Sequence, residues 1–138
     1  MGAARKAGKA TEAGMSYLGA RIPKSTRAAL ERYADRKRLS ASAATAQLLE
    51  EGLRMEQYPG IDFRWTPSGR KAHVTGTGLS AWEMHMIWES HAKSAAKVLK
   101  NYPHLTAAQI RAGAAYIEAY PDETPSLERP AFAKVVKA

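Results

Sequence analysis

The sequence predicts a mainly α protein with short β elements, built from two small units that follow a basic N-terminal arm. Apolar and polar residues alternate from Tyr17 to Pro23, apolar residues then recur at helical spacing up to about Met55, and Tyr58-Pro59-Gly60 interrupts the chain. A chain of 138 residues without cysteine suits one ordinary domain or two small ones in a reducing cytoplasm. We expect an arm at 1–15, a first domain at 16–57, a second domain at 58–121 and an extended tail at 122–138.

The basic charge of the protein is concentrated at its N-terminal end. Residues 1–40 hold ten Lys or Arg against three acidic residues, so about +7 of the formal net charge of +8 lies there. Residues 1–15 contain almost no large apolar side chain and are expected to be flexible, because they bury too little surface to offset the entropy of ordering. A polyanion would bind at this end, where the arm contributes Arg5, Lys6 and Lys9. The alternative is a generically basic surface that only keeps the protein soluble.

The first unit is predicted to be one strand and two helices. Leu18, Ala20 and Ile22 fall on one face of the strand, and the intervening residues fall on the other. Pro23 ends the strand, a helix follows over 24–37, and Ser40 is placed to cap a second helix that runs through Leu53. One strand and two short helices cannot close a stable core. A second copy of the chain is therefore expected to complete it, with the two strands paired antiparallel.

The second unit is predicted to be a β-hairpin followed by three helices. The segments 63–66 and 71–74 flank Pro67-Ser68-Gly69-Arg70, in which Pro and Gly are placed for a turn. Capping boxes at Ser80–Glu83 and Thr106–Gln109 start two of the helices. Between them Ser94 caps a short helix that Pro103 ends, and the last helix stops before Pro121.

The order of strand, proline, helix, serine cap and helix over residues 16–55 resembles the ribbon-helix-helix repressors, such as Arc and MetJ. The resemblance implies a dimeric two-stranded ribbon that enters the major groove of DNA and a phosphate held at the start of the second helix. Gly19 supplies no side chain in the middle of the reading face, and the glycine usual between the helices is replaced near Arg38, so that turn should be capped differently. Transferred to this chain, the expected DNA contacts are Tyr17, Gly19, Arg21, Lys24, Ser40 and Ser42, together with the three basic residues of the arm.

The second unit resembles the uncharacterised-domain family numbered four hundred and thirty-three. The matching residues are Tyr58-Pro59-Gly60, the segment 73–79, Ala81-Trp82-Glu83 and, above all, Tyr102-Pro103-His104-Leu105-Thr106 with 110–112. This family has a helix-turn-helix-like fold and is common in antitoxins that are paired with PIN-like nuclease toxins. The resemblance therefore implies an antitoxin or an autoregulator, with such a toxin as a partner.

The residues give little support for catalysis or metal binding. His85 and Glu89 lie one helical turn apart and His91 is near, but no third ligand stands at a fixed spacing. We expect no enzyme activity, cofactor or metal, because the chain has no glycine-rich phosphate loop, no cysteine and no Ser/His/Asp order. No apolar run is long enough for a membrane span, and no secretion signal is recognisable.

The helix that begins after Ser80 is apolar almost all round. It is either the central helix of its unit or an interface, in which Trp82 and Met86, four residues apart, would contact a partner. Phe132 and Val135 of the tail are the other candidate partner contacts.

Together the residues and the resemblances predict a cytoplasmic, nucleoid-associated transcriptional regulator of antitoxin type. It would act as a homodimer or higher homo-oligomer that binds double-stranded DNA and represses its own operon. The alternative is an architectural or segregation protein that binds DNA with low sequence specificity, as the basic arm and Gly19 would allow. A third possibility is a toxin-bound role without DNA contact.

Overall fold

The computed structural model of the chain describes residues 14–125. The chain divides into two compact units, residues 1–45 and 46–138, and the division falls inside a helix. The predicted contacts Arg5, Lys6 and Lys9 of the arm, and Phe132 and Val135 of the tail, lie outside the described residues.

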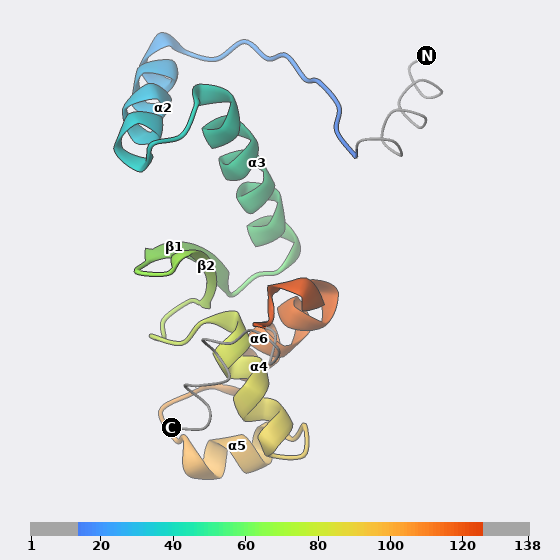
Figure 1. Ribbon diagram of the computed structural model, residues 1–138. Coiled ribbons are helices and arrows are strands. Elements are labelled where there is room, and N and C mark those ends of the chain that lie inside the picture. The colour runs from blue at the N-terminus through green and yellow to red at the C-terminus, as the bar shows by residue number, and fades with distance from the viewer. Residues whose placement is uncertain (1–13, 126–138) are drawn as a thin grey trace. The chain divides into compact units, whose positions relative to one another are not determined.

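The first unit contains helix α2 (Lys24–Lys37) and the start of helix α3 (Ala41–Gln57) (Figure 1). Arg38 ends α2 in the left-handed conformation, with φ 59° and ψ 42°. Its backbone N–H reaches the carbonyl oxygens of Ala34 and Asp35, and the Leu39 N–H donates to the Ala34 oxygen at 2.9 Å. Arg38 thus adopts the backbone that glycine usually supplies at this position. The Ser40 hydroxyl accepts the Ala43 N–H at 3.0 Å and caps α3, as its position predicts.

The predicted N-terminal ribbon-helix-helix is wrong for this structure. Among the described residues the fold is helical, with five α-helices and one two-stranded hairpin in the middle of the chain, and residues 14–23 belong to no helix or strand. The side chains of Tyr17 and Leu18 are 98% and 75% exposed. The alternating pattern specifies which side chains share a face, but a strand also needs a hydrogen-bonding neighbour, which the single chain does not supply.

The second unit begins with a hairpin of strands β1 (Ile61–Thr66) and β2 (Gly69–Val74). The strands pair antiparallel, from Ile61 opposite Val74 to Thr66 opposite Gly69, around the turn expected from Pro67 and Gly69. Gly69 takes φ 116° in this turn, a conformation that side chains rarely allow.

Helices α4 (Ala81–Ser90), α5 (Ala95–Asn101) and α6 (Ala107–Ala119) follow, with a short 3-10 turn η1 (Pro121–Glu123). Both predicted capping boxes form, at Ser80 and at Thr106, and the Ser94 side chain accepts the Lys97 N–H at the start of α5. Helix α6 lies against α4 and the hairpin, and α5 sits at the end of this pair (Figure 1). The core between them is built on five fully buried side chains: Val74, Met84, Val98, Ile110 and Tyr116.

Candidate nucleic-acid interface and the charged pocket

The first unit exposes a basic surface on α2. Residues 14–40 hold seven Lys or Arg and two acidic residues, and six of the seven cations are exposed. Helical spacing places Lys24, Arg32 and Arg36 on the half of α2 opposite its partly buried side, which carries Leu30 and Ala34. We call the exposed cations of this unit the α2 basic face: Arg21, Lys24, Arg27, Arg32, Arg36 and Arg38.

A hollow of about 490 Å³ lies at the N-terminal end of the α2 basic face. Arg21, Lys24 and Arg27 line it together with Glu31 and the small side chains of Ala20 and Ala28. The Arg27 Nε donates to a Glu31 carboxylate oxygen at 3.2 Å. Both side chains of this pair are more than half exposed, so the pair contributes little to stability and its arginine can exchange to another anion.

The structure brings together only part of the predicted DNA-contact set. Arg21 and Lys24 share the hollow, whereas Tyr17 and Gly19 are exposed outside its lining. Ser40 and Ser42 stand at the start of α3, where the Ser40 hydroxyl is used as the helix cap. Arg27, Arg32 and Arg36 were not among the predicted contacts. The spacing of Arg32 and Arg36 on the polar side of the predicted helix could have identified these two, whereas Arg27 falls on the side of Leu30 and Ala34.

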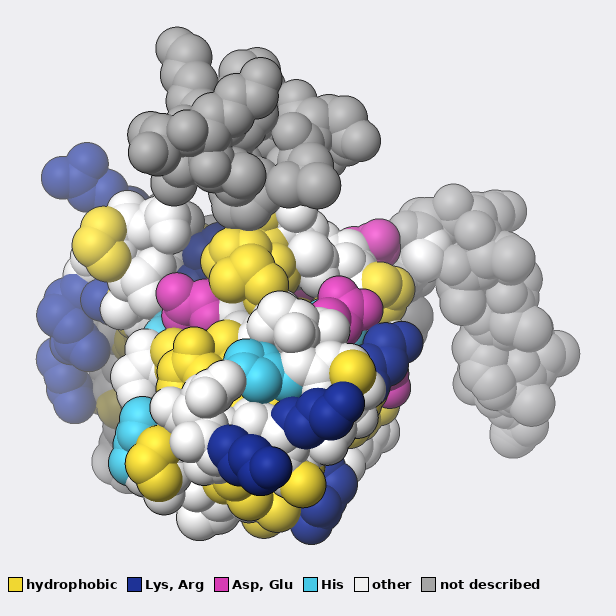
Figure 2. All heavy atoms as spheres, turned by 90° about the horizontal axis from the view of Figure 1, so that it is seen from below, with side chains coloured by type: hydrophobic (Ala, Val, Ile, Leu, Met, Phe, Trp, Pro, Cys, Tyr) yellow, Lys and Arg dark blue, Asp and Glu magenta, His cyan; other side chains and the backbone are white. Residues whose placement is uncertain are grey.

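Cations of the second unit are more scattered. The described basic residues around α5 are Lys93, Lys97 and Lys100, all exposed. Figure 2, which is seen from below, shows Lys and Arg side chains next to hydrophobic, histidine and uncharged atoms.

Trp82 and Met86, the predicted partner contacts of α4, have different surroundings. Trp82 is partly buried and packs against the core of the second unit, whereas Met86 is 47% exposed. Met84 and Ala81, on the same helix, are buried. Helix α4 is therefore a core helix on its Ala81 and Met84 side and leaves Met86 open to solvent.

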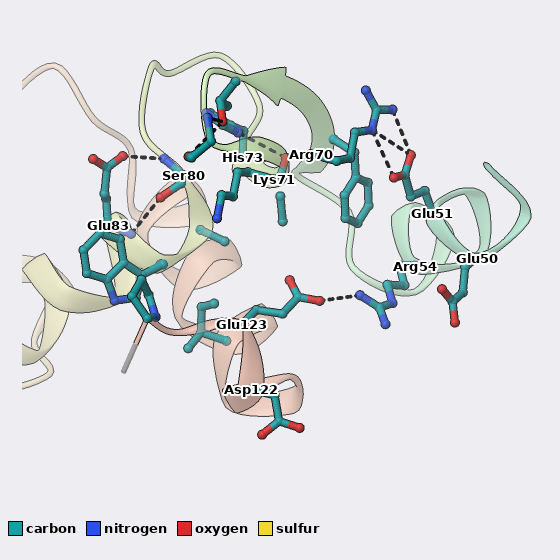
Figure 3. Close-up of a pocket in the computed structure, with 18 of the residues that line it drawn as sticks. Glu50, Glu51, Arg54, Arg70, Lys71, His73, Ser80, Glu83, Asp122 and Glu123 are labelled. Atoms are coloured by element: carbon teal, nitrogen blue, oxygen red, sulfur yellow. Dashed lines mark hydrogen bonds and ion pairs between the residues drawn. The ribbon is translucent and has the colours of Figure 1, made fainter. Parts of the chain in front are cut away.

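A charged pocket of about 690 Å³ lies entirely within the second unit (Figure 3). Two ion pairs stand at its rim. The Arg70 guanidinium donates to both carboxylate oxygens of Glu51, at 2.8 and 3.0 Å, and Arg54 Nη1 donates to Glu123 at 2.6 Å. Figure 3 shows the Glu51 and Arg70 side chains pointing toward each other and Asp122 pointing away from the Arg54–Glu123 pair.

Tyr116 connects the second of these ion pairs to the core. Its hydroxyl accepts a hydrogen bond from Arg54 at 2.8 Å and donates one to Glu123 at 3.0 Å. Burial, together with the neighbouring Glu123 carboxylate, raises the pKa of the Tyr116 phenol above its ordinary value. Burial lowers the pKa of Arg54, but its hydrogen bonds to Glu123 and Tyr116 outweigh that effect and raise it. The three side chains form a structural clamp between α3, α6 and η1.

The histidines show local structural roles. His91 uses Nδ1 toward the Ile87 carbonyl oxygen at 2.8 Å and Nε2 toward the Asn101 side chain at 2.8 Å. His85 and Glu89 are 3.8 Å apart. Within residues 14–125 no group of three or more His, Cys, Asp or Glu side chains is placed to hold a metal ion, and no described helix is long and apolar enough to cross a membrane.

Comparisons of the chain with protein-family models, with curated proteins and with solved structures found no match. The antitoxin function that the resemblances imply therefore stays a prediction.

Proposed function

We propose that this protein binds double-stranded DNA through the α2 basic face and acts as a transcriptional regulator of antitoxin type. The observation that carries the proposal is the set of six exposed cations in the first unit against two acidic residues. A surface of this kind attracts the phosphate backbone, and each neutralised phosphate releases a condensed counterion. In this proposal Arg21, Lys24 and Arg27 contact one stretch of backbone, and the arm adds further contacts.

The protein acts on DNA as a homodimer in this proposal. The support is the small core of the first unit, whose described residues bury only Ala34 and Ala44 among hydrophobic side chains. Leu18 and Ile22 of the same unit remain exposed. Two alanines are too small a core to hold a unit of this size, so a second copy covering the exposed leucine and isoleucine would stabilise it.

An architectural role with low sequence specificity is the second candidate. It is favoured by the exposed position of the α2 cations on a broad helix face, where they suit phosphate contact more than base readout. Base readout needs side chains held at the base edges, and Tyr17 and Arg21 lie in a segment without regular structure. The two candidates differ in one measurable quantity, the ratio of specific to nonspecific affinity.

Fluorescence anisotropy of the full chain tests the proposal on two labelled duplexes: the DNA upstream of the protein's own reading frame and a scrambled duplex of equal composition. A regulator should bind the first at least about a thousandfold more tightly, whereas an architectural protein should bind both alike. The bound complex should contain two chains per duplex. Binding to neither duplex at physiological salt would contradict both candidates.

A charge-matched pair of variants locates the interface. Arg32→Gln with Arg36→Gln should weaken binding to both duplexes and lower the slope of log K against log salt by about 2, because two phosphate contacts are lost. The control, Lys97→Gln with Lys100→Gln, removes the same charge from the second unit and should leave the slope unchanged. Equal losses of DNA affinity in both variants would mean that only the net charge of the protein matters. An unchanged affinity in the Arg32/Arg36 variant would exclude the α2 basic face as the DNA-binding surface.

A further inference from the structure

The charged pocket of the second unit has an acidic character that its internal ion pairs do not cancel. Its lining contains five carboxylates and three Lys or Arg side chains, an excess of two acidic residues. Two of the carboxylates, Glu50 and Asp122, are exposed and make no ion pair within the described chain. The five carboxylates are Glu50, Glu51, Glu83, Asp122 and Glu123.

The pocket also offers an apolar surface between its charges. Phe63 of β1 and Trp82 of α4 are only partly buried and line it, together with Ile117 of α6. Figure 3 shows the labelled charged residues arranged around this space, contributed by α3, the hairpin, the start of α4 and η1. An occupant that fits must therefore combine apolar side chains with positive charge.

The chain leaves the described residues at the pocket itself, because Pro125 is one of the lining residues. Residues 126–138 carry Arg129, Lys134 and Lys137 against the single acid Glu128, an excess of two positive charges. They also carry Phe132, Val135 and Val136 at a spacing of three and four residues. Thirteen residues can extend about 40 Å, which is more than enough to cross a pocket of this volume.

We propose that residues 126–138 of this chain occupy the charged pocket of their own second unit, with their apolar side chains against Phe63 and Trp82 and their basic side chains near Glu50 and Asp122. This segment should occupy the pocket in preference to a free peptide, because it is covalently tethered next to it. A segment joined to the rim by a short linker experiences an effective concentration of about 1 mM, so even a weak intrinsic affinity fills the pocket. The proposal is independent of DNA binding.

Paramagnetic relaxation in the full chain tests this occupancy. The protein has no cysteine, so Ala133→Cys provides a single site for a nitroxide spin label. The amide signals of Ser68, Lys71 and Asp122, which line the pocket, should lose intensity, whereas those of Lys97 and Lys100 on α5 should not. Uniform weak broadening, or broadening elsewhere, would overturn the proposal.

Two variants of the spin-labelled chain separate the contribution of the apolar side chains from that of the charges. Replacing Phe132, Val135 and Val136 with serine should restore the pocket signals without touching the described fold. Glu50→Lys with Asp122→Lys should restore them in part, as should salt at about 1 M, where the screening length falls to about 3 Å. The control Glu89→Lys with Glu118→Lys changes the same charge away from the pocket and should restore nothing. Pocket signals that stay broadened in the triple serine variant would overturn the proposed contact.

Mixing experiments fix the origin of the segment. Chain that carries the nitroxide spin label at natural isotope abundance is mixed with chain that is enriched in nitrogen-15 and carries no spin label. No broadening is expected, because each pocket is filled by its own chain. Broadening in the mixture would overturn the intramolecular contact in favour of exchange between copies.

Discussion

The backbone torsions of single residues set the turn between α2 and α3. Arg38 has φ 59°, a conformation that costs an L-residue other than glycine about 1–2 kcal/mol. Its N–H and that of Leu39 satisfy carbonyl oxygens at the end of α2, so the conformation is required for the helix to end there. The side chain is exposed and makes no hydrogen bond or ion pair with the other described residues, so the cost is one of the backbone alone.

Arg38→Gly should therefore stabilise the protein by about 1 kcal/mol, since glycine reaches this conformation without strain. The control Arg36→Gly removes the same charge from the last turn of α2 and should destabilise by a similar amount, because glycine is a poor helix former. Urea unfolding followed by circular dichroism measures both variants. Equal signs for the two changes would show that charge, and not the backbone of Arg38, controls stability here.

At the scale of elements, the closeness of α4 and α6 depends on one glycine. A Cβ atom at Gly113 would lie 2.7 Å from the Cβ and Cγ atoms of Met84, which is fully buried. Met84 belongs to the core of the second unit, where Val74 also approaches Gly113, with its Cγ2 3.1 Å from the same Cβ position. Gly113 is thus required by the packing of the two helices.

Gly113→Ala should destabilise the second unit by about 1–3 kcal/mol, because the added methyl group forces α4 and α6 apart. The matched control is Gly52→Ala in α3, where an added Cβ meets nothing within 4 Å. This change should stabilise by about 0.5–1 kcal/mol, the usual gain of alanine over glycine in a helix. Thermal unfolding of the full-length variants measures both effects, and a stabilising Gly113→Ala would disprove the close packing.

At the scale of the whole molecule, the second unit begins within α3. Glu51 and Arg54, from the second half of this helix, pair with Arg70 of the hairpin and Glu123 of η1. These contacts belong to the unit that contains the pocket, although the predicted boundary placed both residues in the preceding domain. A fragment that starts at Tyr58 lacks them.

The fragment 46–138 should accordingly unfold cooperatively and be about 1–3 kcal/mol more stable than the fragment 58–138, because removing Glu51 and Arg54 breaks the ion pairs that they make with Arg70 and Glu123. Urea unfolding followed by tryptophan fluorescence compares the two. Neither fragment should bind DNA with submicromolar affinity at physiological salt, since both lack the α2 basic face. Fragments of equal stability would show that the ion pairs of Glu51 and Arg54 contribute nothing to the stability of this unit.

The sequence by itself determined the local structure of this protein. Ser40, Ser80, Ser94 and Thr106 cap helices where their positions predict, and Pro67 and Gly69 mark the hairpin turn, because caps and turns depend on residues a few positions apart. The excess of positive charge near the N-terminus is likewise a property of the sequence alone.

Only the tertiary structure decided the contacts between distant segments. Arg54 meets Tyr116 and Glu123 across separations of 62 and 69 residues, and nothing local in the sequence pairs them. The same reason explains the strand predicted at residues 17–23, whose alternation is a local signal while its ladder needs a neighbour that the described chain does not provide. The periodicity of the sequence specifies which side chains share one face of a helix or strand. Which segment packs or pairs against that face depends on the tertiary structure.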